Sequence, residues 1–434
     1  MLTSRSETGS NFSMKIDHST RVKPVTDERV LLDDSLRPMW TFLRWNGILP
    51  DFLGQETERG LSYGARFLWT LVIAVLIASY FVFELHQLFV EIPEMNSTYG
   101  SVIILSLLIN GFFGLGCMYV CCTNYKNFQL FFRDWKALEK QSMEYFVGVK
   151  KRKSVIILYF IYVMMMVKIV FICTFWNMLE PNRTCFLSSN PDLKDALGVN
   201  ILTLITSIFS YFTHTYQFLG ELVPTLFFYH AGCVVEDLER EVEYVSEVIY
   251  SSTLNIKQLA TATDSVPIIS SIALQFQSIG PFSRIWEKYE TILLMVNRAN
   301  KLFGTSILFG YSAVFIYCSI SCFMSIKLFT VSPALAIGFL TVFLCATSRM
   351  LLMNRLMSHL LLSCQQLKST TAATLGRKWH LLPEEDRLVL ISFHARLDNQ
   401  ELSANPFDLY TVNPSNLMSI LSLIVTYTIV LLQL

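Results

Sequence analysis

The stretch NLMSILSLIVTYTIVLLQL, at residues 416–434, contains no charged residue and indicates a membrane protein. As a helix rising 1.5 Å per residue, it is long enough to cross a hydrocarbon core of about 30 Å. From the residue just before it, polar side chains recur at intervals of four, three, four and seven, so they share one helical face with Val430. They are Ser415, Ser419, Ser422, Thr426 and Gln433.

Two interpretations of this polar face are open. Hydrocarbon cannot satisfy hydroxyl and amide groups, so the face must contact protein or water. It could pack against another helix, because Ser and Thr are common where membrane helices meet. It could instead line a water-filled path through the membrane. Spacing alone does not choose between them.

The composition agrees with a membrane protein, since 53% of the 434 residues are hydrophobic and the formal net charge is zero. A neutral chain gives no electrostatic reason to expect a nucleic-acid partner. The sequence contains no G-x-S-x-G, H-E-x-x-H or Walker motif, and its ten cysteines include no C-x-x-C pair. We therefore expect no enzyme activity, no cofactor and no metal site.

Six further apolar segments occur in the chain, and the seven together predict an all-α, polytopic fold with seven transmembrane helices. An odd number of spans places the two termini on opposite sides of the membrane. The predicted spans are residues 67–90, 101–122, 154–179, 197–229, 302–329, 334–352 and 416–434.

The orientation follows from the charges of the short loops. The 123–153 loop is rich in lysine and arginine, whereas the 90–100 loop has neither. The positive-inside rule therefore predicts a cytosolic N-terminus and an extracellular C-terminus. Glycosylation sequons at Asn96 and Asn182 fall in outer loops under this topology, and we expect both to be glycosylated. A G-protein-coupled receptor has the reverse orientation.

Long amphipathic connections are predicted on the cytosolic side, with helix breaks in the Ser/Thr-rich region 251–282 and near Gly376 and Pro383. They fit either an oligomerisation platform or a simple solvated hairpin. The predicted divisions are 1–60 (cytosolic N-terminal segment), 61–229 (transmembrane helices 1–4), 230–302 (cytosolic helical extension and loop), 303–353 (transmembrane helices 5–6), 354–413 (cytosolic helical anchor) and 414–434 (transmembrane helix 7).

The fourth predicted span carries a second polar stripe, about six turns long. It indicates either a ligand cavity or aqueous path, or hydrogen bonding between helices. Its members are Asn200, Thr203, Ser207, Ser210, Tyr211, His214, Gln217 and Glu221.

Lys168 lies within the third predicted span, where a cation is costly unless it finds a partner. Glu84 and Glu221 are possible partners, and a structural ion pair fits as well as a ligand contact. Trp176 lies near the outer end of the same span, where the aromatic belt of membrane proteins accounts for it.

The last span also resembles a family pattern. Thr426-Tyr427, five following positions and Gln433 are similar to the TYhhhhhQF signature of insect gustatory receptors and their relatives, with Leu434 in place of the usual phenylalanine. The resemblance implies a homotetrameric, ligand-gated cation channel with the seventh helices around a central pore. By position, Val430 and Gln433 would form the extracellular constriction, and Thr426 and Ser422 would face the pore below it.

The resemblance further implies a ligand pocket in the outer half of each subunit, lined by the fourth-span stripe with Lys168 and Trp176. The expected function is a gustatory-type receptor in the plasma membrane, opened by a small-molecule tastant and weakly selective among cations. Expected partners are the lipid bilayer, further copies of the chain and related receptor subunits. An obligate co-receptor subunit, silent alone, and a secondary transporter are the alternatives.

Overall fold

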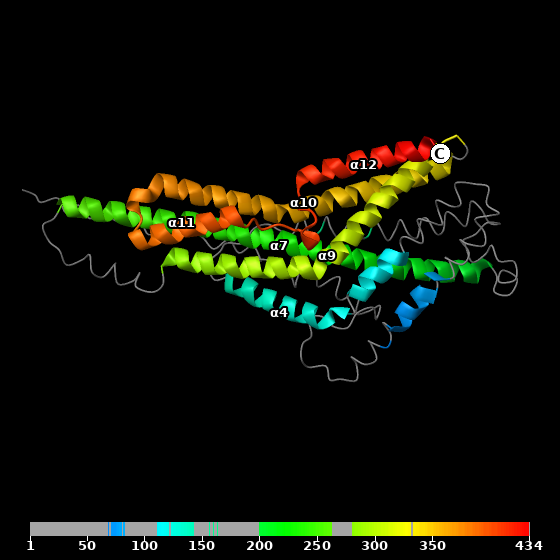
Figure 1. The fold of residues 1–434 in the computed structure, drawn as a ribbon, viewed down its shortest axis with the longest axis horizontal. Helices are drawn as coiled ribbons and strands as arrows, with labels where there is room; N and C mark the ends of the chain where they lie inside the picture. Colours follow the sequence, from blue (N-terminus) through cyan, green and yellow to red (C-terminus); the bar gives the residue numbers. More distant parts are fainter. Residues whose placement is uncertain are drawn as a thin grey trace, which may run out of the picture.

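The computed structural model describes residues 68, 71–79, 81–82, 111–120, 123–142, 156, 159, 163, 199–262, 280–330 and 333–433. Every regular element within these residues is helical, which confirms the all-α prediction. Figure 1 shows an elongated arrangement in which long helices run side by side.

Three long helices make up most of the described fold: α7 (Val199–Ala262), α9 (Pro281–Leu328) and α10 (Pro333–Lys378). At 1.5 Å per residue, each is about 70 Å long or more, at least twice the thickness of a hydrocarbon core. Each of the three packs against the other two. The predicted spans four, five and six therefore continue into neighbouring segments without a break, and the predicted divisions after residues 229, 302 and 353 fall inside continuous helices.

Shorter elements complete the described fold. Helix α4 (Tyr125–Ser142) packs on α9, and α11 (Glu384–Asn399) packs on α9 and α10. The single turns η2 (Trp379–Leu381) and η3 (Pro406–Asp408) lie on either side of α11 in the sequence. Helix α12 (Pro414–Gln433) follows and packs mainly on α9.

We call one group of packed helical segments the anchor bundle: α4, α11 and residues 230–262, 281–302 and 354–378 of the long helices. An aromatic cluster at its border with the predicted membrane spans joins α4, α7 and α9: the Phe227 ring centroid lies 4.9 Å from that of Phe131 and 4.7 Å from that of Trp135. Edge-to-face pairs of this kind add to the hydrophobic gain of burial. Phe303 of α9 packs against the same cluster.

Helix α11 is a packed part of this bundle, because Leu390, Phe393 and Leu397 are fully buried. A simple solvated hairpin would leave such a face in water, so that interpretation of the region is wrong. The predicted break near Pro383 is present, since α11 begins at Glu384, whereas α10 continues past Gly376 to Lys378.

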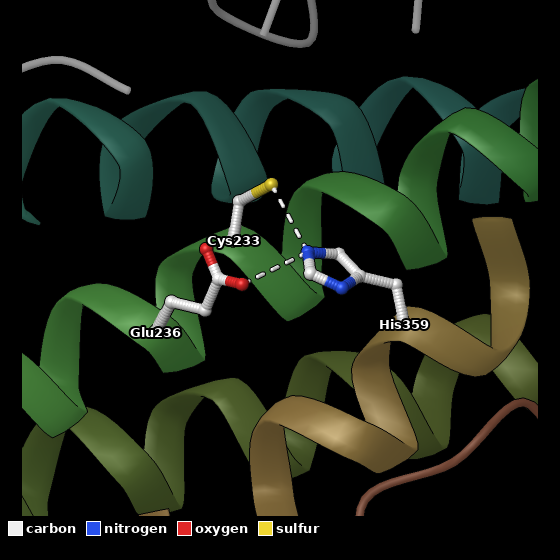
Figure 2. Close-up of side chains that lie close together, drawn as sticks. All are labelled: Cys233, Glu236 and His359. Carbon is white, nitrogen blue, oxygen red and sulfur yellow. Dashed lines mark hydrogen bonds and ion pairs between the residues drawn. The ribbon is translucent and has the colours of Figure 1, made fainter. Parts of the chain in front are cut away.

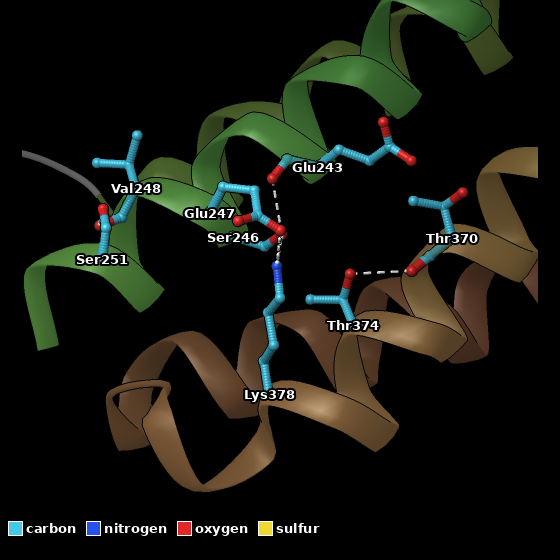
Figure 3. Close-up of polar contacts among 8 residues, drawn as sticks. All are labelled: Glu243, Ser246, Glu247, Val248, Ser251, Thr370, Thr374 and Lys378. Carbon is cyan, nitrogen blue, oxygen red and sulfur yellow. Dashed lines mark hydrogen bonds and ion pairs between the residues drawn. The ribbon is translucent and has the colours of Figure 1, made fainter. Parts of the chain in front are cut away.

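The Ser/Thr-rich break predicted from residue 251 begins too early, because α7 continues to Ala262. Hydroxyls just before and at the start of this region bond back to the helix: Ser246 Oγ donates to Glu243 O at 2.7 Å, and Ser251 Oγ donates to Val248 O at 3.0 Å (Figure 3). Such bonds satisfy the hydroxyl without ending the helix. The Ser/Thr-rich composition therefore predicted the end of the helix too early in the sequence.

Candidate functional site: helix α12 and its attachment

One face of α12 packs against its own chain. Ile424 and Thr428 are its buried residues, and they lie one helical turn apart. Leu417, Ile420 and Leu421 are partly buried against the main core on the same face. This face holds α12 against α9 and α10.

The polar face of α12 points the opposite way. At 3.6 residues per turn, its members lie on average about 180° around the helix from Ile424 and Thr428. All of them are exposed, and Val430 is 46% exposed. Their exposure shows that the polar face does not pack against the described part of this chain, so it is open to water or to another subunit. The exposed residues are Ser415, Ser419, Ser422, Thr426, Val430 and Gln433.

The hydroxyl of Thr426 donates to Ser422 O at 2.9 Å along the helix. Its proton is therefore used inside α12, and its oxygen lone pairs stay available on the exposed face. Tyr427 has a different role, because its ring meets Phe315 of α9 edge-to-face at 5.5 Å. The Thr-Tyr pair thus combines an exposed acceptor with a contact that holds the helix.

The start of α12 is fixed by a chain of hydrogen bonds. Asn413 Oδ1 accepts from Asn416 N at 2.8 Å and from Ser415 Oγ at 2.7 Å, while Pro414 occupies the first helical position. Asn354 Nδ2 of α10 donates to Asn413 O at 3.1 Å, and Tyr311 OH of α9 donates to Asn354 Oδ1 at 3.3 Å. The base of α12 is thereby tied to both long helices.

The connection between α11 and α12 is held in the same way. Asn300 of α9 donates from Nδ2 to Ser403 O at 3.0 Å and accepts from Asn405 N at 2.8 Å. Tyr289 OH donates to Gln400 O at 2.9 Å, and burial raises the pKa of this phenol. The segment leading to α12 is therefore anchored to α9 along its length.

A buried ion pair links α7 and α10 within the predicted membrane spans. Arg349 Nη2 lies 3.2 Å from Glu221 Oε1, and both side chains are at most 4% exposed. Gln217 Nε2 also donates to Glu221 Oε1, at 3.3 Å. A Cβ atom at Gly310 of α9 would lie 2.7 Å from Glu221 Cγ, so only glycine leaves room for the carboxylate there.

This pair changes the interpretation of the fourth-span stripe. Its last two members, Gln217 and Glu221, are buried and make hydrogen bonds between and along helices, which favours the helix-packing interpretation for this end of the stripe. Within the described residues Glu221 pairs with Arg349, and its possible pairing with Lys168 is not tested because Lys168 lies outside them. Arg349 was missed, although an arginine inside the predicted sixth span is a signal for a buried partner.

The remaining predicted site residues are not tested. Lys168, Trp176, Glu84, Asn96 and Asn182 lie outside the described residues. The backbone of the other stripe members is helical within α7, but their side chains lie outside the described part. These are Asn200, Thr203, Ser207, Ser210, Tyr211 and His214.

Charged contacts brace the anchor bundle. Arg396 of α11 binds Glu290 of α9 through two hydrogen bonds of 2.7 and 3.1 Å, which lower the pKa of Glu290. Lys378 of α10 reaches Glu247 of α7 at 2.6 Å (Figure 3). Both pairs are partly exposed, so they position the helices more than they stabilise the fold.

Three described helices are apolar and long enough to cross a membrane: α9, α10 from Ala336, and α12. Together with the anchor bundle, they define a class of protein, a polytopic α-helical membrane protein whose spans continue as packed helices beyond the bilayer.

The chain belongs to the 7tm chemosensory receptor family, whose model matches residues 36–434. This is a family of receptors rather than enzymes. The insect olfactory receptor OR5 from Machilis hrabei has a similar fold, with a TM-score of 0.66 and 13% sequence identity over 93% of this chain and 98% of that one. The same receptor in complex with eugenol gives a TM-score of 0.64 and 12% identity over the same shares. Comparison with curated proteins gave no match.

Proposed function

We propose that this chain is a gustatory-type chemosensory receptor and a ligand-gated, weakly selective cation channel. Four copies would surround a central pore lined by α12, in the plasma membrane with the N-terminus in the cytosol. The observation that carries the proposal is the orientation of α12. Its apolar face holds it to its own chain, while its polar face, with Val430 and Gln433, is exposed.

Family membership and the solved relative support a small-molecule ligand. OR5 from Machilis hrabei has been solved in complex with eugenol, a small organic compound, and its fold is similar to this one. The TYhhhhhQ pattern of residues 426–433 supports the gustatory rather than the olfactory type. We place the ligand in the outer half of the subunit, beside the N-terminal part of α7, which carries Tyr211 and His214.

The gate follows from the side chains of α12. A closed ring of Val430 excludes hydrated ions, because a narrow apolar constriction loses its water. Outward movement would replace this ring by Gln433 amides at the narrowest point. Neutral amides, and the hydroxyl oxygens of Thr426 and Ser422 below them, offer dipoles without net charge, so discrimination among cations is weak.

Opening must be a tilt rather than a translation of α12. Its base is fixed through Asn413 to Asn354 and Tyr311, whereas Val430 lies 17 residues further along the helix. That is about 26 Å at 1.5 Å per residue, so a tilt of about 5° moves Val430 by about 2 Å. A ligand opens the pore to the extent that it binds the tilted state more tightly than the closed state.

The function is tested by voltage-clamp recording from cells that express this chain alone. A panel of sugars, amino acids and bitter compounds is perfused, and surface expression is measured in the same cells. We expect a ligand-evoked current that reverses near zero millivolts and changes its cation preference in Gln433→Ala. Saturable uptake without channel current would indicate a transporter instead. Current that requires a related subunit would indicate an obligate co-receptor.

A further inference from the structure

Three potential metal ligands converge where α7 and α10 pack together in the anchor bundle (Figure 2). His359 Nε2 of α10 lies 3.7 Å from Cys233 Sγ and 3.4 Å from Glu236 Oε1, both of α7. The three ligand atoms all lie within 4.8 Å of one another. We expected no metal site from the sequence, which has no local ligand spacing, and this group escapes such a rule because its histidine is 126 residues from its cysteine.

The backbone brings these side chains together. Cys233 and Glu236 are three residues apart and so share one face of α7. The neighbouring Gly232 allows a close approach, because a Cβ atom there would lie 2.9 Å from Leu360 N and 3.0 Å from His359 Cδ2. The Tyr229 ring lies 5.2 Å from the imidazole and limits its orientation.

The geometry fits a tetrahedral metal better than hydrogen bonding alone. One imidazole nitrogen has either one proton or one lone pair in the ring plane, yet both Cys233 Sγ and Glu236 Oε1 approach the same nitrogen. Around tetrahedral Zn²⁺, sulfur and nitrogen ligands lie about 3.6 Å apart, and nitrogen and oxygen ligands about 3.3 Å apart, from the usual bond lengths. The observed 3.7 and 3.4 Å agree with both values.

We propose that Cys233, Glu236 and His359 bind a divalent transition metal of the Zn²⁺ class and that the metal joins α7 to α10. Thiolate, imidazole and carboxylate together suit Zn²⁺, whereas Mg²⁺ and Ca²⁺ prefer oxygen ligands alone. Cys233 is 2% exposed, and the side chains of the other two are each 25% exposed, so water can reach a fourth position. The predicted topology places the group on the cytosolic side, where thiols stay reduced.

The test uses Co²⁺ as a spectroscopic probe on the full-length protein, purified in detergent and first treated with a chelator. We expect one Co²⁺ per chain with the near-ultraviolet charge-transfer band of a cobalt–thiolate bond. Zn²⁺ should displace it, and excess Mg²⁺ should not. Cys233→Ser should remove the band, whereas Cys364→Ser, which replaces another buried cysteine of the bundle, should keep it.

A second variant keeps the test decisive if Cys233→Ser folds poorly. Glu236→Gln changes a partly exposed side chain and leaves the thiolate in place. We expect it to keep the band but to weaken Co²⁺ binding at least about tenfold, since the loss of even an outer partner costs 10–100-fold. Absence of the band in folded wild-type protein would overturn the proposal, as would a band that is lost in Cys364→Ser and kept in Cys233→Ser.

Discussion

Replacing Val430 by asparagine is expected to raise the basal cation current several-fold in the absence of ligand. Val430 is the apolar residue on the exposed polar face of α12, and four copies would form the dewetted constriction. An amide at this position lets water and ions remain in the closed pore. The measurement is whole-cell current at fixed voltage, normalised to the amount of receptor at the cell surface.

Two variants serve as controls for this result. Val430→Leu keeps the constriction apolar and should leave the basal current low. Val425→Asn introduces the same amide on another exposed face of α12, where Val425 is 58% exposed, and should also leave it low. Equal basal currents in Val430→Asn and Val425→Asn would show that Val430 has no special position at the gate.

Removing one partner of the Glu221–Arg349 pair should severely reduce the amount of folded receptor at the cell surface. Arg349→Met leaves the Glu221 carboxylate buried and without its cation. An orphaned buried charge costs about 3–5 kcal/mol, a large share of the roughly 5–15 kcal/mol that stabilises a typical protein. Surface biotinylation and thermal unfolding in detergent measure the loss.

The double variant Glu221→Met with Arg349→Met separates charge burial from packing. With both charges removed, expression should return toward the wild-type level, because an apolar pair fills the same space without desolvation cost. Arg355→Met, an exposed arginine on the same helix, should have little effect. If the double variant were as damaged as Arg349→Met, the pair would matter for more than charge compensation.

Patterns along one helix were predictable from the sequence. The seven-span, all-α fold and the polar face of α12 both follow from apolar length and helical period, which are local properties. The agreement between the helical period and the structure is best in α12. Thr426, Val430 and Gln433 are exposed, and the buried Ile424 and Thr428 lie on the opposite face.

Contacts between helices were not predictable, because they depend on how distant segments align. Glu221 and Arg349 are 128 residues apart, and Cys233 and His359 are 126 apart, so no spacing rule joins them. The continuity of α7 past residue 251 was hidden for a different reason. Ser and Thr favour loops on average, but Ser246 and Ser251 bond back to their own helix.

Cysteine accessibility along α12 decides whether its polar face lines an ion path. Residues 414–434 contain no cysteine, so single cysteines can be introduced there into channels that carry the Val430→Asn current. A membrane-impermeant thiol reagent should rapidly change the current of Ser422→Cys, Thr426→Cys and Gln433→Cys. It should leave Ile424→Cys and Thr428→Cys unaffected. The reverse pattern, with modification at residues 424 and 428 but not on the polar face, would show that the polar face does not line the ion path.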